Sequence, residues 1–362
     1  MNARRDPLHP HGAGRRRARS RGMHPLAAVL VAALLAVGAC GSTATSAPVG
    51  TTAASAASPV KLTVGLGYIP SVQFAPFYLA LQSGYYRDAG LDVTFQNKID
   101  PDLVPLVGQG SVDIGIGDGT SVIPAVAQGI PIRYVATIYA KFPSIVLAKA
   151  SSGIKTAADL KGRRIGTPGR YGSGWIMLEA LLGSAGLTTS DVDVQLYPDF
   201  GQGAALAQGA VDAATGFVNN EPVQLELAGT PATILRVDQI VPLPGNGLIA
   251  GVATLQSKHE ALRAFVTATL RAMRDVTADP AKGLAAAVAA VPDLGKDPAT
   301  QTAILKASID TWSNDYTAAH GLGAIDRSAW QSTLTFMSGL PGAALPSIPP
   351  VDSLVDESLL GG

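Results

Sequence analysis

Aromatic side chains gather in four short segments of this 362-residue chain, and a fifth segment, 118–121, adds polar groups only. The segments are residues 68–77, 118–121, 139–143, 167–175 and 217–221, and they hold eight of the twenty Phe, Trp and Tyr residues. Flat apolar walls with a few polar groups suit the stacking of a planar heterocycle. We therefore expect a heterocycle site that includes Tyr68, Phe74, Tyr139, Phe142, Tyr171, Trp175 and Phe217. The eighth residue, Phe77, begins a predicted helix and is expected to pack inward.

Polar side chains that can read ring nitrogens and exocyclic amines lie in the same segments. They are Gln73, Asp118, Thr120, Ser173, Asn219, Asn220 and Glu221. Asp and Asn are also common helix caps, so for Asp118 and Asn219 a purely structural role stays equally open. Residues 172–174 should begin a helix, whose first backbone N–H groups have no partner within the helix.

Basic residues are scarce in these segments, where Lys141 and Arg170 are the only two. An anion would need such cationic donors or a helix N-terminus. The alternative ligand is therefore an alkanesulfonate or a nitrate-like anion, held by Arg170 and the predicted helix N-terminus near Ser173.

The sequence gives catalysis little support. Once residues 1–39 are set aside, the histidines that remain are His259 and His320, and they lack metal-ligand spacing. The glycine-rich segment GTPGRYGSG lacks the Gly-Lys-Ser/Thr end of a phosphate loop, and no Gly-x-Ser-x-Gly elbow occurs. We expect no catalytic residue, no metal and no cofactor.

Alternating strands and helices must position these segments. Residues 61–67, 91–95 and 113–117 read as strands, with helices expected at 77–82, 101–108 and 122–128. Strands that alternate with helices of this length predict a largely parallel sheet covered on both faces. In such units, ligands bind beyond the carboxyl ends of the strands, where the aromatic segments fall.

A faint internal repeat predicts two such units. A shift of 99 residues superposes glycines at matching strand starts and helix ends, and the Q-G-x-V-D block of residues 109–113 recurs at 208–212. Internal self-similarity is typical of duplicated supersecondary units. We read two similar α/β lobes, although chance similarity between generic α/β patterns is the simpler alternative.

The C-terminal third follows a different pattern. Residues 258–278 carry apolar residues near the helical period, and residues 283–291, 300–312 and 328–339 continue the helical character. This region is expected to add helices rather than a third sheet.

The first sixty residues predict export. Seven arginines precede the twelve apolar residues 26–37, which would rise about 18 Å as a helix, too short for a bilayer core of roughly 30 Å. The only cysteine, Cys40, follows directly after small residues and resembles the acylated cysteine of bacterial lipoproteins. We expect a signal peptide at 1–39, with Met1 favoured over Met23 as the start, and a flexible tether at 40–59. An ordinary signal with a coincidental cysteine is the alternative.

The charge of the remaining chain argues against a nucleic-acid partner. Residues 40–362 keep 20 basic and 26 acidic residues, a net charge of about −6. Phosphate binding requires a basic footprint, which this balance does not supply.

Several motifs resemble one family of periplasmic solute-binding proteins, the binders of alkanesulfonates and thiamine pyrimidine precursors. The motifs are GYIPSVQFAPFYLALQSGYYRDAGLDV, GSVDIGIGD, TAADLKGRRIGTPG and GAVDAATGF followed by Asn-Glu-Pro, and they span about residues 61–250. The segments GYIPSVQFAPFYLA and NNEPVQL look closest to the riboflavin- and pyrimidine-binding branches.

The resemblance implies a type II periplasmic binding fold with two doubly wound lobes, a hinge and C-terminal helices. Lobe I would comprise residues 60–145 and 245–362, and lobe II residues 146–244. The implied function is capture of a small molecule for an ABC permease and its ATPase, with a lipid anchor as the only membrane attachment. The yeast pyrimidine synthase of this superfamily has a histidine where this chain has Phe74, and a cysteine-rich motif that is absent here, so an enzyme is not expected.

Overall fold

A computed structural model describes residues 58–99, 102–238, 243–339 and 345–361. These residues belong to one compact unit, Ala56–Gly362. The predicted signal peptide, Cys40 and all but the last two residues of the predicted tether lie outside the described residues. None of the helices in the described part of the chain is both long and apolar enough to cross a membrane.

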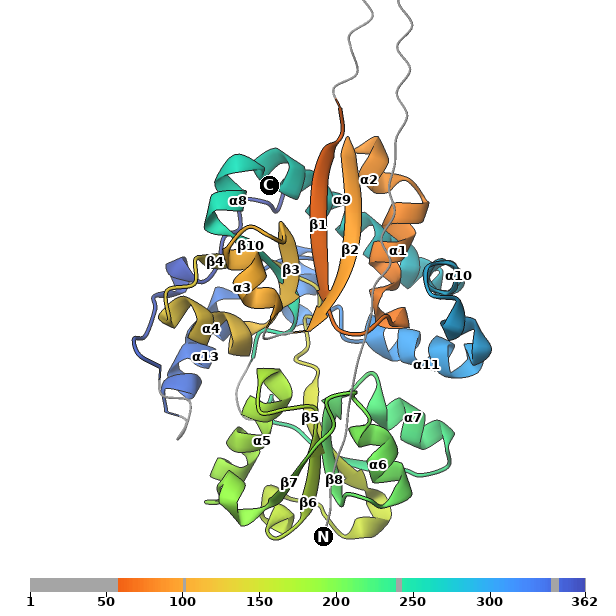
Figure 1. Ribbon diagram of the computed structural model, residues 1–362, viewed down its shortest axis with the longest axis vertical. Helices are drawn as coiled ribbons and strands as arrows, with labels where there is room; N and C mark the ends of the chain where they lie inside the picture. The colour runs from red at the N-terminus through yellow and green to blue at the C-terminus, as the bar shows by residue number, and fades with distance from the viewer. Residues whose placement is uncertain (1–57, 100–101, 239–242, 340–344, 362) are drawn as a thin grey trace, which may run out of the picture. The chain divides into compact units, whose positions relative to one another are not determined.

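Two five-stranded sheets form the frame of this unit (Figure 1). The sheet of lobe I has the order β2-β1-β3-β10-β4, and the sheet of lobe II has the order β7-β6-β8-β5-β9. The strands of lobe I are β1 (Val60–Gly67), β2 (Leu91–Ile99), β3 (Ile114–Gly117), β4 (Ile132–Thr137) and β10 (Gly247–Gly251). Those of lobe II are β5 (Ser144–Lys149), β6 (Arg164–Thr167), β7 (Asp193–Leu196), β8 (Ala213–Phe217) and β9 (Ala232–Leu235).

Each sheet contains one strand that runs against its neighbours. β10 pairs antiparallel with β3 and β4, and β5 pairs antiparallel with β8 and β9, whereas β1 and β6 pair in parallel with both of their neighbours. The sheets are therefore mixed, and the expected largely parallel sheet holds only for the other four strands of each. The antiparallel strands, β5 and β10, are the first strands that the chain forms after each crossing between the lobes. The local sequence pattern does not reveal this direction.

Two crossing segments connect the lobes. Residues 138–143 lead from β4 to β5, and residues 236–246 lead from β9 to β10. β5 joins the sheet of lobe II from Ser144, two residues before the predicted start of that lobe.

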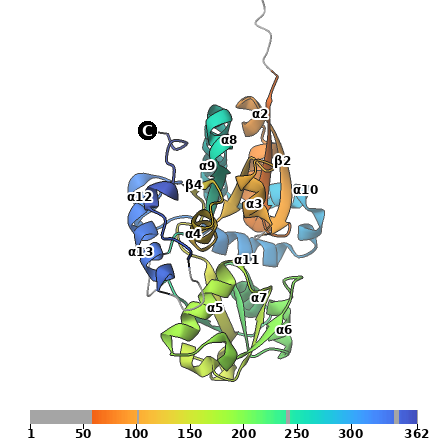
Figure 2. The same cartoon turned by 60° about the vertical axis from the view of Figure 1, so that its left-hand side comes forward.

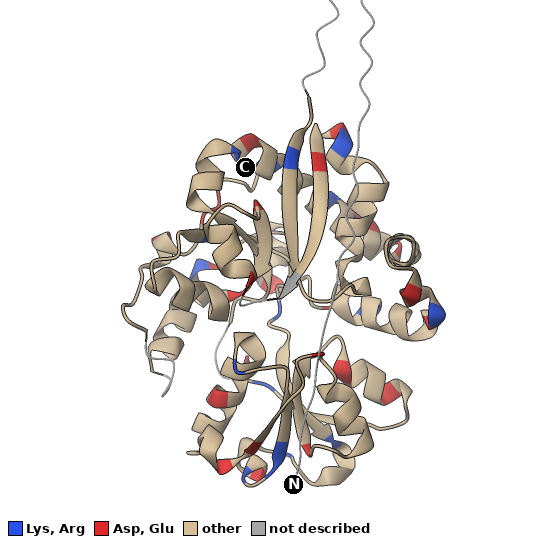
Figure 3. Ribbon diagram, viewed as in Figure 1, with Lys and Arg blue, Asp and Glu red and all other residues tan. Residues whose placement is uncertain are grey.

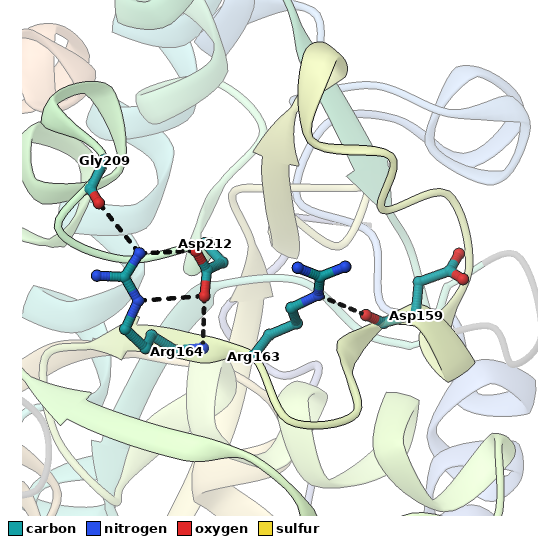
Figure 4. A network of polar contacts seen from close by, with 5 residues as sticks. All are labelled: Asp159, Arg163, Arg164, Gly209 and Asp212. Carbon is teal, nitrogen blue, oxygen red and sulfur yellow. Dashed lines mark hydrogen bonds and ion pairs between the residues drawn. The ribbon is translucent and has the colours of Figure 1, made fainter.

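The predicted repeat is visible in the sheets, and its Val-Asp pair has a structural role. The Asp113 Oδ2 accepts the Thr63 N–H of β1 at 2.8 Å, and the Asp212 Oδ2 accepts the Arg164 N–H of β6 at 2.9 Å. Each aspartate thus holds the equivalent strand of its own lobe. The Lys258 Nζ pairs with Asp113 at 2.7 Å, whereas Arg164 itself pairs with Asp212 at 2.8 Å (Figure 4).

Helices cover both faces of each sheet (Figures 1 and 2). The helices before the second crossing are α1 (Ala75–Gln82), α2 (Tyr85–Asp88), α3 (Leu103–Gly108), α4 (Gly119–Ala127), α5 (Gly172–Ser184), α6 (Gln202–Gln208) and α7 (Glu221–Leu227). Those after it are α8 (Val252–Ser257), α9 (His259–Ala278), α10 (Pro280–Ala290), α11 (Pro298–Ile309), α12 (Asp315–His320) and α13 (Arg327–Ser338). The C-terminal third is helical, as expected, and adds to lobe I.

Successive residues of a strand place their side chains on opposite faces of the sheet, because the strand is pleated. In β10, Leu248 and Ala250 pack with α1 and α9, while Ile249 packs with α3, α4 and α13 on the other face. In β5, Val146 and Leu147 likewise enter separate cores. These cores hold the strand ends, and the loops that follow them, in fixed positions.

Candidate ligand-binding site

A cavity lies where the carboxyl ends of β1 and β3 face those of β6 and β8. Its empty space, counting the part that opens to solvent, is about 1090 Å³. Residues from both lobes and from the first crossing segment line it.

Aromatic side chains form much of the cavity wall. Lobe I and the crossing contribute Tyr68, Phe74, Phe77 and Tyr139, and lobe II contributes Tyr171, Phe200 and Phe217. The Tyr68 and Phe200 rings meet edge to face across the lobes, with centroids 4.8 Å apart and planes at 80°. Five of the seven aromatic residues predicted for the site thus line this cavity. Phe77, expected to pack inward, is 1% exposed and touches both the core and the cavity.

Phe200 is a cavity residue that the sequence reading missed. It follows β7, and its φ of 62° is the only positive value among the non-glycine residues that the structure describes. An L-residue in the left-handed region is strained by about 1–2 kcal/mol. Its ring contact with Tyr68 offsets part of that strain, and the backbone turn aims the ring at lobe I.

Asp118 is a helix cap that also lines the cavity. As the N-cap of α4, its Oδ1 accepts the N–H groups of Thr120 and Ser121 at 2.9 and 3.1 Å, and it also lines the cavity. Burial raises the pKa of this carboxyl above its usual range, although the hydrogen bonds oppose that shift. The Thr120 hydroxyl donates to the same oxygen at 2.6 Å, and Thr120 itself does not line the cavity.

Glu221 lines the cavity from lobe II, with both carboxyl oxygens engaged. The Oε2 accepts the Phe217 N–H at 2.8 Å, and the Oε1 accepts the Gln202 Nε2 at 3.2 Å. Burial raises the pKa of this carboxyl too. A Cβ on Gly216 would lie 2.7 Å from the Oε2, so only glycine leaves room for the carboxylate there. Burial and the neighbouring Glu221 also raise the pKa of the Tyr68 hydroxyl.

Asn219 connects the lobes and does not line the cavity. It is fully buried, and its Nδ2 donates to the Ser308 Oγ of α11 at 2.9 Å and to the Gln73 Oε1 at 3.5 Å. The Tyr139 hydroxyl donates to the same Gln73 oxygen at 3.2 Å. Since Gln73 and Tyr139 line the cavity, this network joins the cavity wall to the contact between the lobes. The residue at the N-cap of α7 is Asn220, which lines the cavity, so Asn219 does not cap that helix.

Three further predicted residues lie away from the cavity. Phe142 is 1% exposed in the core of lobe II, where its ring packs with β5 residues. Trp175 packs partly against the same core, and the Arg170 guanidinium lies 5.3 Å from the centre of the Trp175 ring. Ser173 does line the cavity, and it accepts a 2.6 Å hydrogen bond from the Ser144 hydroxyl.

Two cavity residues carry unpaired polar atoms. The Gln202 Oε1 and the Asn246 Oδ1 are buried without a hydrogen-bond partner among the described residues. An unsatisfied buried acceptor costs about 1–3 kcal/mol. Both residues lie outside the five segments from which the site was predicted, so the sequence pattern did not indicate them.

The cavity wall lacks cationic side chains. No Lys, Arg or His of the described chain lines it, whereas two carboxyl groups do. Lys and Arg residues occur in both lobes (Figure 3). Within the described ranges, no group of three or more His, Cys, Asp and Glu side chains is placed to hold a metal ion. The wall therefore suits a neutral ring better than an anion.

Comparisons with known proteins agree with this geometry. The family model described as NMT1/THI5 like matches residues 71–283. The riboflavin-binding protein RibY of Chloroflexus aurantiacus is 35% identical over 310 residues, covering 82% of this chain and 88% of that protein. The 4-amino-5-hydroxymethyl-2-methylpyrimidine phosphate synthase THI13 of Saccharomyces cerevisiae is 28% identical over 251 residues, covering 66% and 73%.

A solved structure shows the same fold. The alkanesulfonate-binding protein SsuA from Xanthomonas axonopodis pv. citri, bound to MOPS, matches with a TM-score of 0.62 at 22% identity, covering 82% of this chain and 98% of that one. The predicted periplasmic-binding-protein fold is confirmed.

Proposed function

The chain belongs to the NMT1/THI5-like family, and on that premise we propose that it is an extracytoplasmic substrate-binding protein of an ABC importer. Its cargo is a small neutral heterocycle, riboflavin or a thiamine pyrimidine precursor, held between the lobes. One observation carries this proposal: seven aromatic side chains from both lobes line a cavity whose described wall holds no cationic group.

The wall suits a planar ring in two ways. Rings from opposite lobes can contact both faces of a heterocycle, and offset or edge contacts add about 0.5–1.5 kcal/mol each beyond the apolar area they bury. Amide and carboxyl groups at the carboxyl ends of the strands can then read the polar edge. The wall holds two carboxyl groups and none of the cationic side chains of the described residues, which disfavours an anionic ligand.

Binding without chemistry is the second part of the proposal. RibY is named a binding protein and is 35% identical, whereas the synthases of the family match at lower identity. No histidine or cysteine of the described chain lines the cavity to act as a proton carrier or nucleophile. The partners we propose are the permease and ATPase of the importer, with no nucleic acid.

Attachment to the membrane through Cys40 is the third part. The signal-like residues 1–39 and the single cysteine support it. Cells grown with a clickable fatty-acid analogue should label the wild-type protein and leave a Cys40→Ser variant unlabelled. Equal labelling of both proteins would show that Cys40 is not the site of lipid attachment.

Thermal unfolding with a panel of solutes tests the cargo. Riboflavin, hydroxymethylpyrimidine, formylaminopyrimidine, taurine and nitrate are each added to the purified protein. A ligand at 100 times its Kd stabilises by about 2.7 kcal/mol, which should raise the Tm by about 5 °C. A shift with one of the heterocycles and none with the anions is expected. A shift in Tm with taurine or nitrate alone would show that the ligand is an anion and not a heterocycle. Turnover of any solute would show that the protein is an enzyme.

A further inference from the structure

Gln202 has an unusual position in the cavity wall. It is the first residue of α6, it is 2% exposed and it lines the cavity. Four buried side-chain polar atoms of the described chain lack a hydrogen-bond partner, and the Gln202 Oε1 is one of them. An acceptor held in this way needs a donor that the protein does not provide.

The direction of the Gln202 amide is determined by its neighbours. The Nε2 donates to the Thr215 carbonyl oxygen at 3.3 Å and to the Glu221 Oε1 at 3.2 Å. Both partners are acceptors, so a reversed amide would set oxygen against oxygen. The oxygen is therefore the end of the amide without a protein partner, on a residue that lines the cavity.

Glu221 is held in turn by lobe II. The Phe217 N–H donates to its Oε2 at 2.8 Å, and its side chain lies against Gly203 and Gly216, where an added Cβ would come within 2.9 and 2.7 Å of it. Both carboxyl oxygens are engaged with protein donors. Although Glu221 lines the cavity, its hydrogen bonds position Gln202 and the end of β8.

We propose that Gln202 determines specificity by accepting a hydrogen bond from a ring N–H or an exocyclic amine of the heterocycle, and that Glu221 is the positioning residue that keeps the amide oxygen toward the ligand. This inference rests on the proposed function, because it names the feature by which the same cavity selects its cargo. Heterocycles that carry such a donor bind, and those alkylated at that nitrogen are rejected.

The test compares ligands that differ only at the donor. Riboflavin is compared with 3-methylriboflavin, and hydroxymethylpyrimidine with its dimethylamino derivative, by calorimetric titration of the purified protein. The wild type should prefer the N–H member of the binding pair by about tenfold or more. Equal affinity of the wild type for both members would overturn the proposal.

Gln202→Leu removes the acceptor and keeps a similar size. We expect about tenfold weaker binding of the N–H ligand and unchanged binding of the methylated one, so that the preference is lost. The matched control is Gln208→Leu, at the exposed end of the same helix, which should keep the preference. A Gln202→Leu protein that still prefers the N–H ligand would contradict the role of Gln202.

Glu221→Gln supplies a second, independent readout. The new amide should keep its oxygen on the Phe217 N–H and turn its NH2 toward the Gln202 Nε2, so that Gln202 loses one of the two acceptors that orient its amide and keeps only the Thr215 carbonyl. The preference for the N–H ligand should fall, whereas a purely structural role would weaken both ligands equally. If no heterocycle binds the wild type, the proposed function itself fails; if one binds and no variant changes the preference, only the present inference fails.

Discussion

The two lobes share a frame and differ in what they present to the cavity. Both sheets have the same strand order, with one strand inserted from the partner lobe, and each uses an aspartate at the equivalent position to hold its first strand. At the cavity, lobe I presents the aliphatic side chains Leu66, Ile116 and Ile138 beside its rings. Lobe II presents no aliphatic side chain except Pro168, and it has three Ser and Thr hydroxyl groups against one in lobe I. A duplicated frame can therefore present different side chains to one cavity through its loops alone.

The largest expected effect distinguishes the rings of the two lobes. Phe77 is buried in the core of lobe I, within 6.4 Å of the Phe74, Phe95 and Phe265 rings, whereas Phe217 of lobe II is half-buried. Phe77→Ala should lower the free energy of unfolding by about 3–5 kcal/mol, because it leaves a core cavity. Phe217→Ala should cost less than about 1.5 kcal/mol of stability and act mainly on ligand affinity. Urea unfolding measures the loss of stability, and calorimetric titration measures the loss of affinity. Equal losses of stability in the two variants would contradict the assignment of Phe77 to the core and of Phe217 to ligand contact.

The paired aspartates should show a smaller difference in the same direction. Asp113 is the more buried side chain, 11% exposed against 29% for Asp212. Asp113→Ala should cost about 2 kcal/mol of stability and Asp212→Ala about 1 kcal/mol, as measured by urea unfolding at pH 7. A larger loss from Asp212→Ala would show that lobe II depends more on this contact than lobe I does.

The pH dependence of stability should test the contribution of Asp212 separately from that of Asp113. Hydrogen bonds from Arg164 lower the pKa of Asp212 in the folded state. Its contribution is therefore complete above the unfolded pKa of about 3.9 and is lost as the pH falls through the lower folded value. The difference in stability between the wild type and Asp212→Asn should shrink as the pH falls below about 4. A constant difference across that range would contradict the pKa shift.

The network between the lobes should act on dissociation of the ligand. Asn219→Ala removes the hydrogen bonds to Ser308 and Gln73 without changing a cavity residue, so the lobes should separate more readily. We expect about tenfold faster ligand release in stopped-flow measurements, with little change in association. Ser308→Ala is the matched variant at the other end of the bond. Effects of the two substitutions that simply add would show that they do not act through one contact.

Arg170 should give the smallest effect. Its guanidinium lies over the Trp175 ring and not at the cavity wall, so Arg170→Ala should change heterocycle affinity by less than about twofold. A large loss of affinity measured by calorimetry would revive the anion alternative, in which Arg170 holds the ligand.

The sequence predicted the frame better than the direction of individual side chains. Strand and helix patterns, together with the Q-G-x-V-D repeat, indicated two α/β lobes, and the loops after β1, β3, β6 and β8 could be placed at one site because such strand ends share an edge. Phe142 of the first crossing segment and Trp175 of the segment after β6 were predicted for the same site, yet they face the core of lobe II, and no local pattern distinguishes the two directions. Phe200 and Gln202 follow β7, a strand whose end was not assigned to the site. The antiparallel entry of β5 and β10 depends on pairing between distant strands, which alternation alone does not specify.

Calorimetric titration of the purified protein at several temperatures tests the central claim most directly. Riboflavin, hydroxymethylpyrimidine, taurine and nitrate are titrated into the same preparation. A cavity that closes aromatic side chains around a neutral ring predicts one-to-one binding of a heterocycle with a negative heat-capacity change, because apolar surface leaves water. Binding of taurine or nitrate, with both heterocycles producing no heat of binding at any temperature, would contradict it.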